Sequence, residues 1–331
     1  MKTGASDATG LLIGVDVGGT KVAAGVVDQN GAILRQTRVP MAATGSASAG
    51  LACVISAIRN LGGNRKSLAL PDAVQGIGVC APGPLDPHTG VIINPPNLPC
   101  WRDYPLAAQI SQTFRLPVRV DNDANAAALA EARWGAGRGY RNVFYATIGT
   151  GIGTGIVFDG HIYHGRTGAA AEGGHVSIDY RGPRCACGKP GCIEVLASGP
   201  AIARRARAKL AESTAQSSIL DLAGGNIADV SSETVAQAFA AGDGVAQELL
   251  LETIELLALW LGNMVDLLEP DVIVVGGGVA VMLSPLMENL RERLPACAIN
   301  PRCREIPVVL ARYGADAGIA GGAALCKNLA E

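Results

Sequence analysis

Residues 11–27 read LLIGVDVGGTKVAAGVV, two apolar runs separated by the turn GGTK. A second turn, DQNG at 28–31, leads into a third run from Ala32 to Val39. Short apolar runs joined by glycine- and asparagine-rich turns are typical of a β-meander. The same order returns at 142–158, which reads NVFYATIGTGIGTGIVF and is followed by the turn Asp159-Gly160. We therefore predict an internal duplication, with one copy in each of two domains.

The rest of the chain mixes strand and helix patterns, which indicates an α/β fold. Further buried strands are expected at 75–80, 117–120, 272–275 and 307–310. Helices are expected at 48–62, 104–115, 123–134, 199–211, 231–240, 244–268, 282–294 and 315–329, and a long loop rich in Pro, Gly and Asn at 81–103.

The composition sets the broad class of the protein. A chain of 331 residues with 49% hydrophobic residues suits about two domains with buried cores and excludes a disordered chain. The net charge of −2 argues against a globally basic nucleic-acid binder, so no nucleic-acid partner is expected. The most apolar stretch, 245–268, carries four acidic residues, which argues against a membrane span. The N-terminus MKTGASDATG does not resemble a signal peptide, which favours a cytoplasmic location.

Glycine is in excess, with 43 residues in the chain, about 13% against a usual ~7%. The glycines gather in turns, where a backbone without Cβ atoms can approach a ligand. The turn Asp16-Val17-Gly18-Gly19-Thr20-Lys21 offers donors and a positive charge to a polyanion, and Asp16 can hold water around a divalent ion. A type I′ hairpin with a surface lysine is the simpler alternative.

Two glycine turns in the second half extend this chemistry. Residues 149–155 (GTGIGTG) repeat the Gly/Thr pattern, so two turns could grip the phosphates of one nucleotide from both sides. Residues 276–278 (GGG) follow a buried strand, and the carboxyl ends of strands are where ligands bind in α/β sheets. A helix-entry turn is the simpler alternative for this second segment.

Residues 121–125 (DNDAN) place polar groups at a strand-to-helix junction among apolar neighbours. We expect these groups at the edge of a cleft. Asp123 is the candidate general base toward a hydroxyl, and Asn122 could bind a sugar hydroxyl. Capping of the following helix by Asp123 or Asn122 is the simpler alternative.

A compact set of metal-binding side chains lies at 175–192. His175, Cys185, Cys187 and Cys192 have the spacing H-x9-C-x-C-x4-C, and glycines loosen the turn between them. One imidazole and three thiolates form a closed, structural zinc site. The other six cysteines are isolated along the chain and are expected to be structural thiols. His88, His161 and His164 are expected to be solvated loop histidines.

Two glutamates flank the proposed metal loop, Glu172 before His175 and Glu194 after Cys192. A rigid metal loop beside carboxylates would preorganise acceptors for a polyol. Ordinary surface carboxylates are the alternative.

Together these segments resemble the ROK family (repressors, open reading frames and sugar kinases) over nearly the whole chain, and its glucokinase-type members most. The motifs are VDVGGTK at 15–21, APGPLD at 81–86, NLPCW at 97–101, VDNDANAAALAE at 120–131, IGTGIGTGIV at 148–157, AAEGGH at 170–175 and CACGKPGCIE at 185–194.

The resemblance implies an actin-like, ribonuclease-H-like fold of two α/β domains with an active site in the cleft between them. A small N-terminal domain would span 1–122, joined by a C-terminal helix at about 315–331. A larger domain with the zinc loop would span 123–314. It also implies ATP-dependent phosphorylation of a hexose at the 6-hydroxyl with Mg²⁺, and a homodimer or homotetramer.

The resemblance assigns the site residues by position. Asp123 would be the base, with Asp16 orienting Mg²⁺. The sugar hydroxyls would be held by Asn97, Asn122, Glu172, His175 and Glu194, with His175 also on zinc. The phosphates would be lined by Gly18, Gly19, Thr20, Lys21, Thr150 and Gly151, and the adenosine end by Gly277 and Gly278.

Glucose is the first choice of substrate, and N-acetylmannosamine, N-acetylglucosamine, fructose and allose are the alternatives. Cys100 and Gly173 depart from the residues expected beside the sugar pocket, which weakens the choice of hexose. A repressor is disfavoured because about ten residues before the first strand cannot form a helix-turn-helix. A non-catalytic sugar sensor is the remaining alternative.

Overall fold

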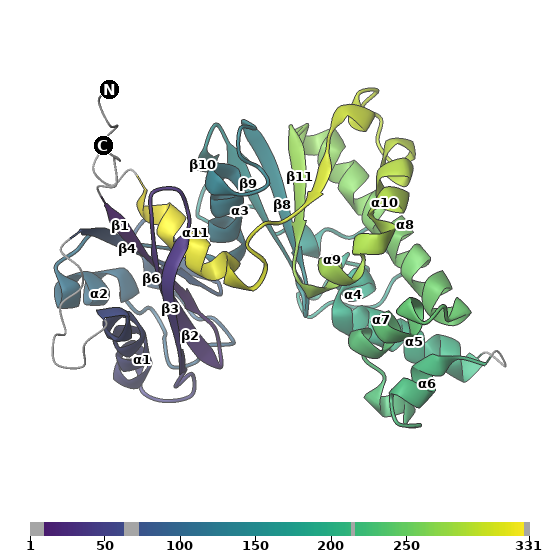
Figure 1. Cartoon of the computed structure of the whole chain (residues 1–331), viewed down its shortest axis with the longest axis horizontal. Helices are drawn as coiled ribbons and strands as arrows, with labels where there is room; N and C mark the ends of the chain where they lie inside the picture. Colours follow the sequence, from purple (N-terminus) through teal and green to yellow (C-terminus); the bar gives the residue numbers. More distant parts are fainter. Residues whose placement is uncertain (1–9, 63–72, 213–215, 328–331) are drawn as a thin grey trace, which may run out of the picture. The chain divides into compact units, whose positions relative to one another are not determined.

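The structure is a computed structural model that describes residues 10–62, 73–212 and 216–327 (Figure 1). Most of the N-terminal stretch MKTGASDATG lies outside the described residues, as do the last residues of the expected C-terminal helix. None of the described helices has the length and apolar character needed to cross a bilayer.

The first meander is confirmed, and it forms three strands of a five-stranded sheet. Strand order is β3-β2-β1-β4-β7. β1 pairs antiparallel with β2, and β2 with β3, whereas β1, β4 and β7 run parallel. The strands are β1 Leu11–Val17, β2 Lys21–Val27, β3 Ile33–Pro40, β4 Val74–Ala81 and β7 Val118–Asn122. A two-stranded ribbon of β5 Leu85–Asp86 and β6 Val91–Ile92 occupies the expected loop.

The second sheet has the same plan as the first. Its order is β10-β9-β8-β11-β12, with β8, β11 and β12 parallel. The strands are β8 Asn142–Ile148, β9 Ile152–Phe158, β10 His161–Ile162, β11 Val272–Gly276 and β12 Val308–Leu310. In each sheet, a run of three strands joined by short turns is extended by two later strands, as a duplication predicts.

The helices follow the expected positions, with short additions. They are α1 Ala47–Arg59, α2 Leu106–Phe114, α3 Asp123–Trp134, α4 Glu194–Ala197, α5 Gly199–Glu212, α6 Ser218–Leu222, α7 Ser232–Ala240, α8 Gly244–Leu268, α9 Gly278–Met282, α10 Met287–Arg293 and α11 Ala317–Cys326. Short 3₁₀ helices connect them, among them η2 Gly173–His175. The acidic side chains of α8 lie on its more exposed side, while Leu249, Trp260 and Leu261 are buried.

The expectation of one helix over 282–294 is wrong. The segment is split into α9, a 3₁₀ turn at Ser284–Leu286 and α10. Pro285 lies in the first turn of this 3₁₀ segment. A proline lacks a backbone N–H and clashes with the preceding turn, so the apolar periodicity continues while the helix does not.

The chain divides into two compact units. The first comprises residues 1–139, 155–171 and 315–331, and the second comprises 140–154 and 172–314. The first unit therefore includes α3 and the segment around β10, in addition to the first sheet and α11. The two units are defined by how compactly the residues pack. The expected boundary between a domain at 1–122 and a domain at 123–314 therefore stays a prediction.

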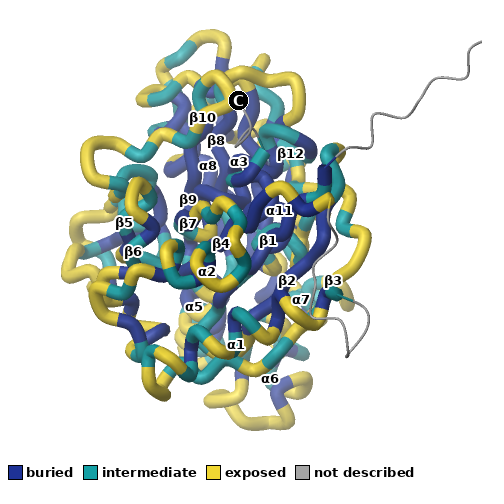
Figure 2. Tube along the Cα trace, turned by 90° about the vertical axis from the view of Figure 1, so that its left-hand side faces the viewer, coloured by how far each residue is buried: buried dark blue, intermediate teal, exposed yellow. Residues whose placement is uncertain are grey.

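Helix α11 packs against the first sheet by backbone contact. Cβ atoms added at Gly14 or Gly78 would overlap the carbonyl oxygens of Ile319 and Gly322 on this helix. Figure 2 shows the resulting buried layer in dark blue along β1 and α11. Only glycine allows a helix to approach a strand this closely.

We expect Gly78→Ala to destabilise the protein by about 3 kcal/mol, because the new methyl group has no space and α11 must move off the sheet. Urea unfolding followed by circular dichroism measures this effect. Gly244→Ala is the matched control, because no atom lies within 4 Å of its added Cβ. Equal unfolding midpoints for both variants would show that this close packing is not required.

Candidate functional site

The turn between β1 and β2 carries the residues expected at the phosphates. The Gly18 N–H donates to the Lys21 carbonyl at 2.9 Å, which closes the turn and leaves Thr20 and Lys21 exposed. An added Cβ at Gly19 would lie 2.9 Å from the Asn97 carbonyl oxygen, so the NLPCW loop lies against this turn. The structure thus brings Asn97 and the glycine turn together within the first unit.

Asp16 ends its strand beside this turn. Its carboxylate lies 3.8 Å from the Cys80 thiol, and a Cβ at Gly318 would overlap it. Burial raises the pKa of Asp16, against the lowering effects of Lys21 and of the Cys80 hydrogen bond. Burial, together with the charges of Asp16 and Asp123, also raises the pKa of Cys80. Asp16 is therefore a carboxylate that a cation would stabilise.

The β7–α3 junction carries Asn122 and Asp123. Asn122 is the N-cap of α3, and its Oδ1 accepts from the N–H groups of Ala124 at 2.9 Å and Asn125 at 3.5 Å. The capping alternative is thus correct for Asn122. Asp123 is exposed in the first helical turn, and one of its oxygens accepts from Ala124 N–H at 2.8 Å.

Asp121, the residue before Asn122, stabilises this junction through side-chain hydrogen bonds. One of its oxygens accepts from the Asn122 N–H at 2.7 Å and from Asn125 Nδ2 at 3.2 Å. The other lies 2.6 Å from Nε2 of His164. Asp121 is 3% exposed. The expectation that His164 is a solvated loop histidine is wrong, because the fold pairs it with a buried carboxylate 43 residues away.

The turn between β8 and β9 carries Thr150 and Gly151 in the second unit. The Gly149 N–H donates to the Gly151 carbonyl at 2.9 Å, and the Gly149 carbonyl accepts from Gly199 N–H at 2.8 Å. On its other side, Glu194 accepts from the Ile152 N–H at 2.9 Å, and an added Cβ at Gly151 would lie 2.6 Å from a Glu194 oxygen. The turn therefore joins two features of this unit, a pocket and the metal loop.

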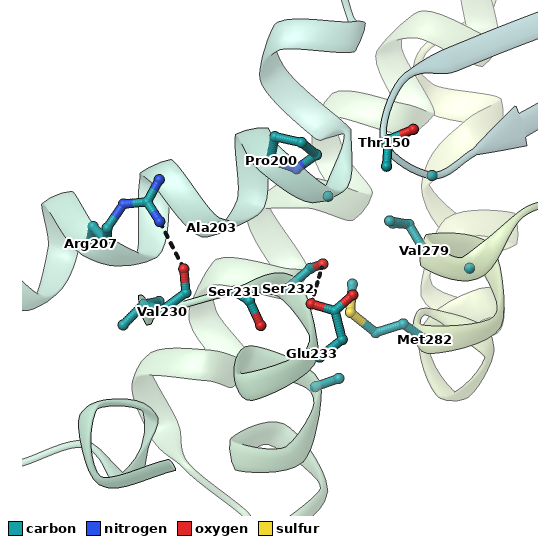
Figure 3. Close-up of a pocket in the computed structure, with 14 residues that line it drawn as sticks. Thr150, Pro200, Ala203, Arg207, Val230, Ser231, Ser232, Glu233, Val279 and Met282 are labelled. Carbon is teal, nitrogen blue, oxygen red and sulfur yellow. Dashed lines mark hydrogen bonds between the residues drawn. The ribbon is translucent and has the colours of Figure 1, made fainter. Parts of the chain in front are cut away.

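The pocket has a volume of about 720 Å³ and lies wholly within the second unit (Figure 3). Its walls come from the β8–β9 turn and from α5, α7 and α9, whose first residues Gly199, Ser232 and Gly278 line it. The side chains that line it include Thr150, Pro200, Ala203, Arg207, Val230, Ser231, Ser232, Glu233, Ala236, Val279 and Met282. A mainly apolar pocket of this size suits a flat heterocyclic ligand.

Gly277 and Gly278 lie at the entry of α9. Gly277 has a φ of +88° and caps α9, and a Cβ there would overlap the Ile148 carbonyl oxygen. The helix-entry alternative is therefore correct for this segment. Gly278 also lines the pocket, so the turn serves both the fold and the ligand site.

Sequence reasoning missed most of this pocket. Its residues from α5 and α7 come from stretches far apart in the chain, and none forms a local motif. The one local signal is the capping box at Ser231 and Thr234, which marks where α7 begins. The Arg207 guanidinium donates to the Val230 carbonyl at 2.7 Å and ties α5 to the start of α7.

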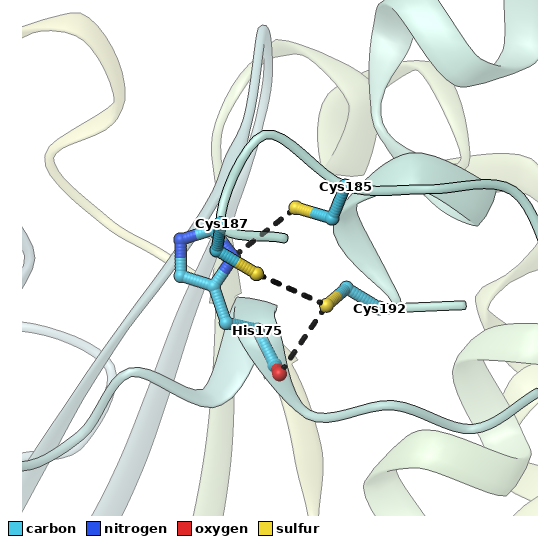
Figure 4. Close-up of side chains that lie close together, drawn as sticks. All are labelled: His175, Cys185, Cys187 and Cys192. Atoms are coloured by element: carbon cyan, nitrogen blue, oxygen red, sulfur yellow. Dashed lines mark hydrogen bonds between the residues drawn. The ribbon is translucent and has the colours of Figure 1, made fainter. Parts of the chain in front are cut away.

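His175, Cys185, Cys187 and Cys192 come together as expected. Their candidate ligand atoms all lie within 4.8 Å of one another (Figure 4). Cys185 Sγ lies 3.5 Å from His175 Nδ1, and the sulfurs of Cys187 and Cys192 are 3.6 Å apart. Tetrahedral zinc with its usual bond lengths separates sulfur from nitrogen by about 3.6 Å and two sulfurs by about 3.8 Å. The donor set therefore fits zinc.

The protonation of this cluster also suits a metal. Burial raises the pKa of the Cys192 thiol to about 12, whereas the Lys189 backbone N–H lowers the pKa of the exposed Cys187 thiol. Because zinc binds thiolates, it would displace these protons. Nδ1 is the ring nitrogen of His175 that faces the cysteines, which leaves Nε2 for another partner.

The departure at Gly173 has a structural cause. The Gly173 N–H donates to Thr154 Oγ1 at 2.8 Å, and the Gly173 carbonyl accepts from Trp260 Nε1 at 3.0 Å. An added Cβ would lie 2.7 Å from Thr154 Oγ1. A bulkier residue at position 173 would disrupt this packing. The packing fixes the backbone that carries Glu172 and His175. Cys100 is half-buried against Gly50 beside Trp101.

A family model described as the ROK family matches residues 12–329. A glucokinase of Halalkalibacterium halodurans is 35% identical over 322 residues, covering 96% of this chain and 94% of the relative. The crystal structure of a ROK family glucokinase from Streptomyces griseus, in complex with glucose and AMPPNP, superposes with a TM-score of 0.77 at 35% identity. That match covers 96% of this chain and 99% of the glucokinase. The crystal structure of a ROK family transcriptional regulator, a homologue of the E. coli MLC protein, superposes with a TM-score of 0.84 at 27% identity. That match covers 96% of this chain and 77% of the regulator.

Proposed function

Because this chain belongs to the ROK family and has its two-domain α/β fold, we propose that it transfers the γ-phosphoryl group of ATP to the 6-hydroxyl of glucose. The observation that carries the proposal is its full-length likeness to sugar kinases, one of which has been crystallised with glucose and an ATP analogue. The chain retains the carboxylate, glycine turns and acidic acceptors that such a reaction needs.

Asp123 is the proposed general base. Its carboxylate takes the proton of the 6-hydroxyl as the hydroxyl oxygen forms a bond to the γ-phosphorus. The bond from the γ-phosphorus to the bridging oxygen breaks, and ADP leaves with that oxygen. Asn122 and Asp121 support this step because their side chains accept hydrogen bonds from backbone N–H groups at the start of α3. These bonds fix the backbone on both sides of Asp123.

The remaining sugar hydroxyls are assigned to Asn97, Asn122, Glu172, His175 and Glu194. Carboxylates and amides are suitable partners because sugar hydroxyls both donate and accept hydrogen bonds. His175 would use Nε2 for the sugar while Nδ1 binds the zinc ion. Zinc would be structural, since four protein ligands leave no open position. Exclusion of water from around the bound sugar would limit ATP hydrolysis.

The nucleotide base is assigned to the pocket formed by α5, α7 and α9. The phosphates are assigned to Gly18, Gly19, Thr20, Lys21, Thr150 and Gly151, and the adenosine end to Gly277 and Gly278. Asp16 would hold Mg²⁺ through water, and the ion would spread the negative charge on the phosphates. With the phosphates held mainly by backbone N–H groups, a net charge near zero is consistent with ATP as substrate.

We expect Ala236→Trp to raise the KM for ATP by about tenfold or more and to leave the KM for glucose nearly unchanged. Ala236 is half-buried in the pocket wall, so an indole there would occupy the space assigned to the base. Steady-state kinetics with each substrate varied in turn measures both constants. Ala240→Trp, at the exposed last residue of the same helix and outside the lining of the pocket, is the control. An unchanged KM for ATP in Ala236→Trp would exclude this pocket as the nucleotide site.

A panel of hexoses tests the reaction itself. ADP release is measured with ATP, Mg²⁺ and glucose, N-acetylmannosamine, N-acetylglucosamine, fructose or allose, and the position of the phosphate is read from the ³¹P–¹H couplings of the product. We expect the highest kcat/KM with glucose and a 6-phosphate product. A higher kcat/KM with another hexose would support the kinase activity but replace glucose as the proposed substrate. No hexose-dependent ADP release would leave the sugar-sensor alternative.

The assembly and location follow the family resemblance. We propose a homodimer or homotetramer that works in the cytoplasm in carbohydrate metabolism, without nucleic-acid or membrane partners.

A further inference from the structure

A second pocket, of about 440 Å³, lies wholly within the first unit. Of the groups used in the proposed kinase reaction, it is lined only by Asp121, which supports the start of α3 and is not assigned to a substrate. Its walls come from β7, α3, the β10 segment and the end of α11. Three residues with basic side chains line it, namely Arg119, Arg133 and Lys327. We call it the arginine–histidine pocket, because His88, His161 and His164 also line it.

The charges of this pocket are not balanced by the protein. Asp121 is its single acidic lining residue, and both carboxylate oxygens already have partners, one of them His164 Nε2 at 2.6 Å. Within residues 10–62, 73–212 and 216–327, no carboxylate forms an ion pair with Arg119, Arg133 or Lys327. Arg133 and Lys327 are half-buried, whereas Arg119 is exposed. Half-buried cations without a counterion are unfavourable unless a ligand supplies the negative charge.

Two of the three cations are held in place. The Arg133 guanidinium donates to the carbonyls of Ala324 and, at 3.1 Å, Lys327, which ties α3 to the end of α11. The Lys327 ammonium donates to the Gln29 carbonyl at 3.1 Å and lies 5.3 Å from the Trp134 ring centroid. Burial lowers the pKa of Lys327, and the neighbouring charges of Arg133 and Arg138 lower it further. The fold therefore holds the positive charges of Lys327 and Arg133 near each other, which is electrostatically unfavourable.

The imidazoles add donors with a defined arrangement. The rings of His88 and His164 meet edge to face with centroids 5.8 Å apart, and His164 is oriented by its bond to Asp121. Arginine and imidazole N–H groups match the oxygens of a phosphate group, which carries close to two negative charges and three terminal oxygens. A carboxylate ligand carries a single negative charge, so it would neutralise fewer of the three cations than a phosphate group would.

We propose that the arginine–histidine pocket binds a phosphate-bearing small molecule at a site separate from the kinase centre. The volume admits a phosphate monoester as well as inorganic phosphate. The phosphate group is held by Arg119, Arg133 and Lys327, and the rest of the ligand lies toward the histidines.

Isothermal titration of the full-length protein with inorganic phosphate and, separately, with glucose 6-phosphate tests this site. The ionic strength is held constant and no nucleotide is present. We expect binding that weakens about tenfold or more in Arg119→Gln and in Lys327→Gln, and that weakens for the wild type as NaCl is raised. Arg59→Gln, an exposed cation of the same unit at the end of α1, is the matched control and should bind like the wild type.

The two ligands distinguish the source of the phosphate. Tighter binding of glucose 6-phosphate identifies a sugar phosphate, and equal or tighter binding of inorganic phosphate identifies the free ion. Circular dichroism melts establish that the variants are folded, and Arg133 is left intact because it holds α11. Absence of binding to wild type at millimolar ligand overturns the proposal, as does equal affinity in all variants. The titration requires no turnover, so a protein that phosphorylates no hexose could still pass it.

Discussion

Asp123→Ala is expected to reduce kcat with glucose by about 10² to 10⁴-fold, the usual contribution of a general base. The fold should survive, because the N-cap of α3 is Asn122 and not Asp123. The exposed Asp123 carboxylate contributes to the helix only through the Ala124 N–H and the helix dipole, about 0.3–1 kcal/mol. A coupled assay for ADP, with hexose and ATP each varied, separates the loss in kcat from any change in KM.

The matched control is Asp221→Ala. Asp221 is also an exposed acidic residue in the first turn of a helix, α6, so its removal has a similar effect on a helix dipole without touching the site. We expect wild-type kcat for this variant and similar melting temperatures for both. If Asp123→Ala kept more than a few percent of the wild-type kcat, another group would have to be the base.

Cys187→Ser is expected to lose the bound metal and about 4 kcal/mol or more of stability together, because structural zinc contributes directly to folding. Cys187 is the informative position, since its side chain is exposed while Cys185 and Cys192 are buried. Removing an exposed thiol costs almost no packing, so a large destabilisation reports on the metal. Elemental analysis of the purified protein and thermal unfolding measure the two effects.

Cys297→Ser is the control for the loss of a thiol. Cys297 is half-buried and lies outside the cluster, so this variant should retain one zinc ion per chain and most of its stability. Activity of Cys187→Ser should fall as well, because His175 and Glu194 are held by the same loop. A folded, metal-free and fully active Cys187→Ser protein would rule out a structural zinc site.

The β-meanders, their duplication and the metal cluster were predictable from the sequence because their information is local. Strands β1 to β3 are joined by turns of a few residues, so apolar alternation and turn chemistry suffice. The four residues of the His/Cys cluster lie within 18 positions of one another, from His175 to Cys192. Helix periodicity was less reliable, since it continued through the 3₁₀ turn at Pro285, which separates α9 from α10.

The residues that face one another from distant segments could not be predicted in this way. The Asp121–His164 pair, the nucleotide-sized pocket and the arginine–histidine pocket depend on which strands and helices become neighbours. Gly173 looked like a departure beside the sugar site, and only the structure shows Thr154 and, 87 residues away, Trp260 occupying its surroundings.

The sequence by itself therefore determined the elements, the duplication and the chemistry available in each turn, because backbone preference and side-chain spacing act over a few residues. The tertiary structure alone decided which of those groups meet. Contacts such as Asp121 with His164, or Arg133 with the end of α11, arise from the packing of sheets and helices, and packing depends on the whole chain.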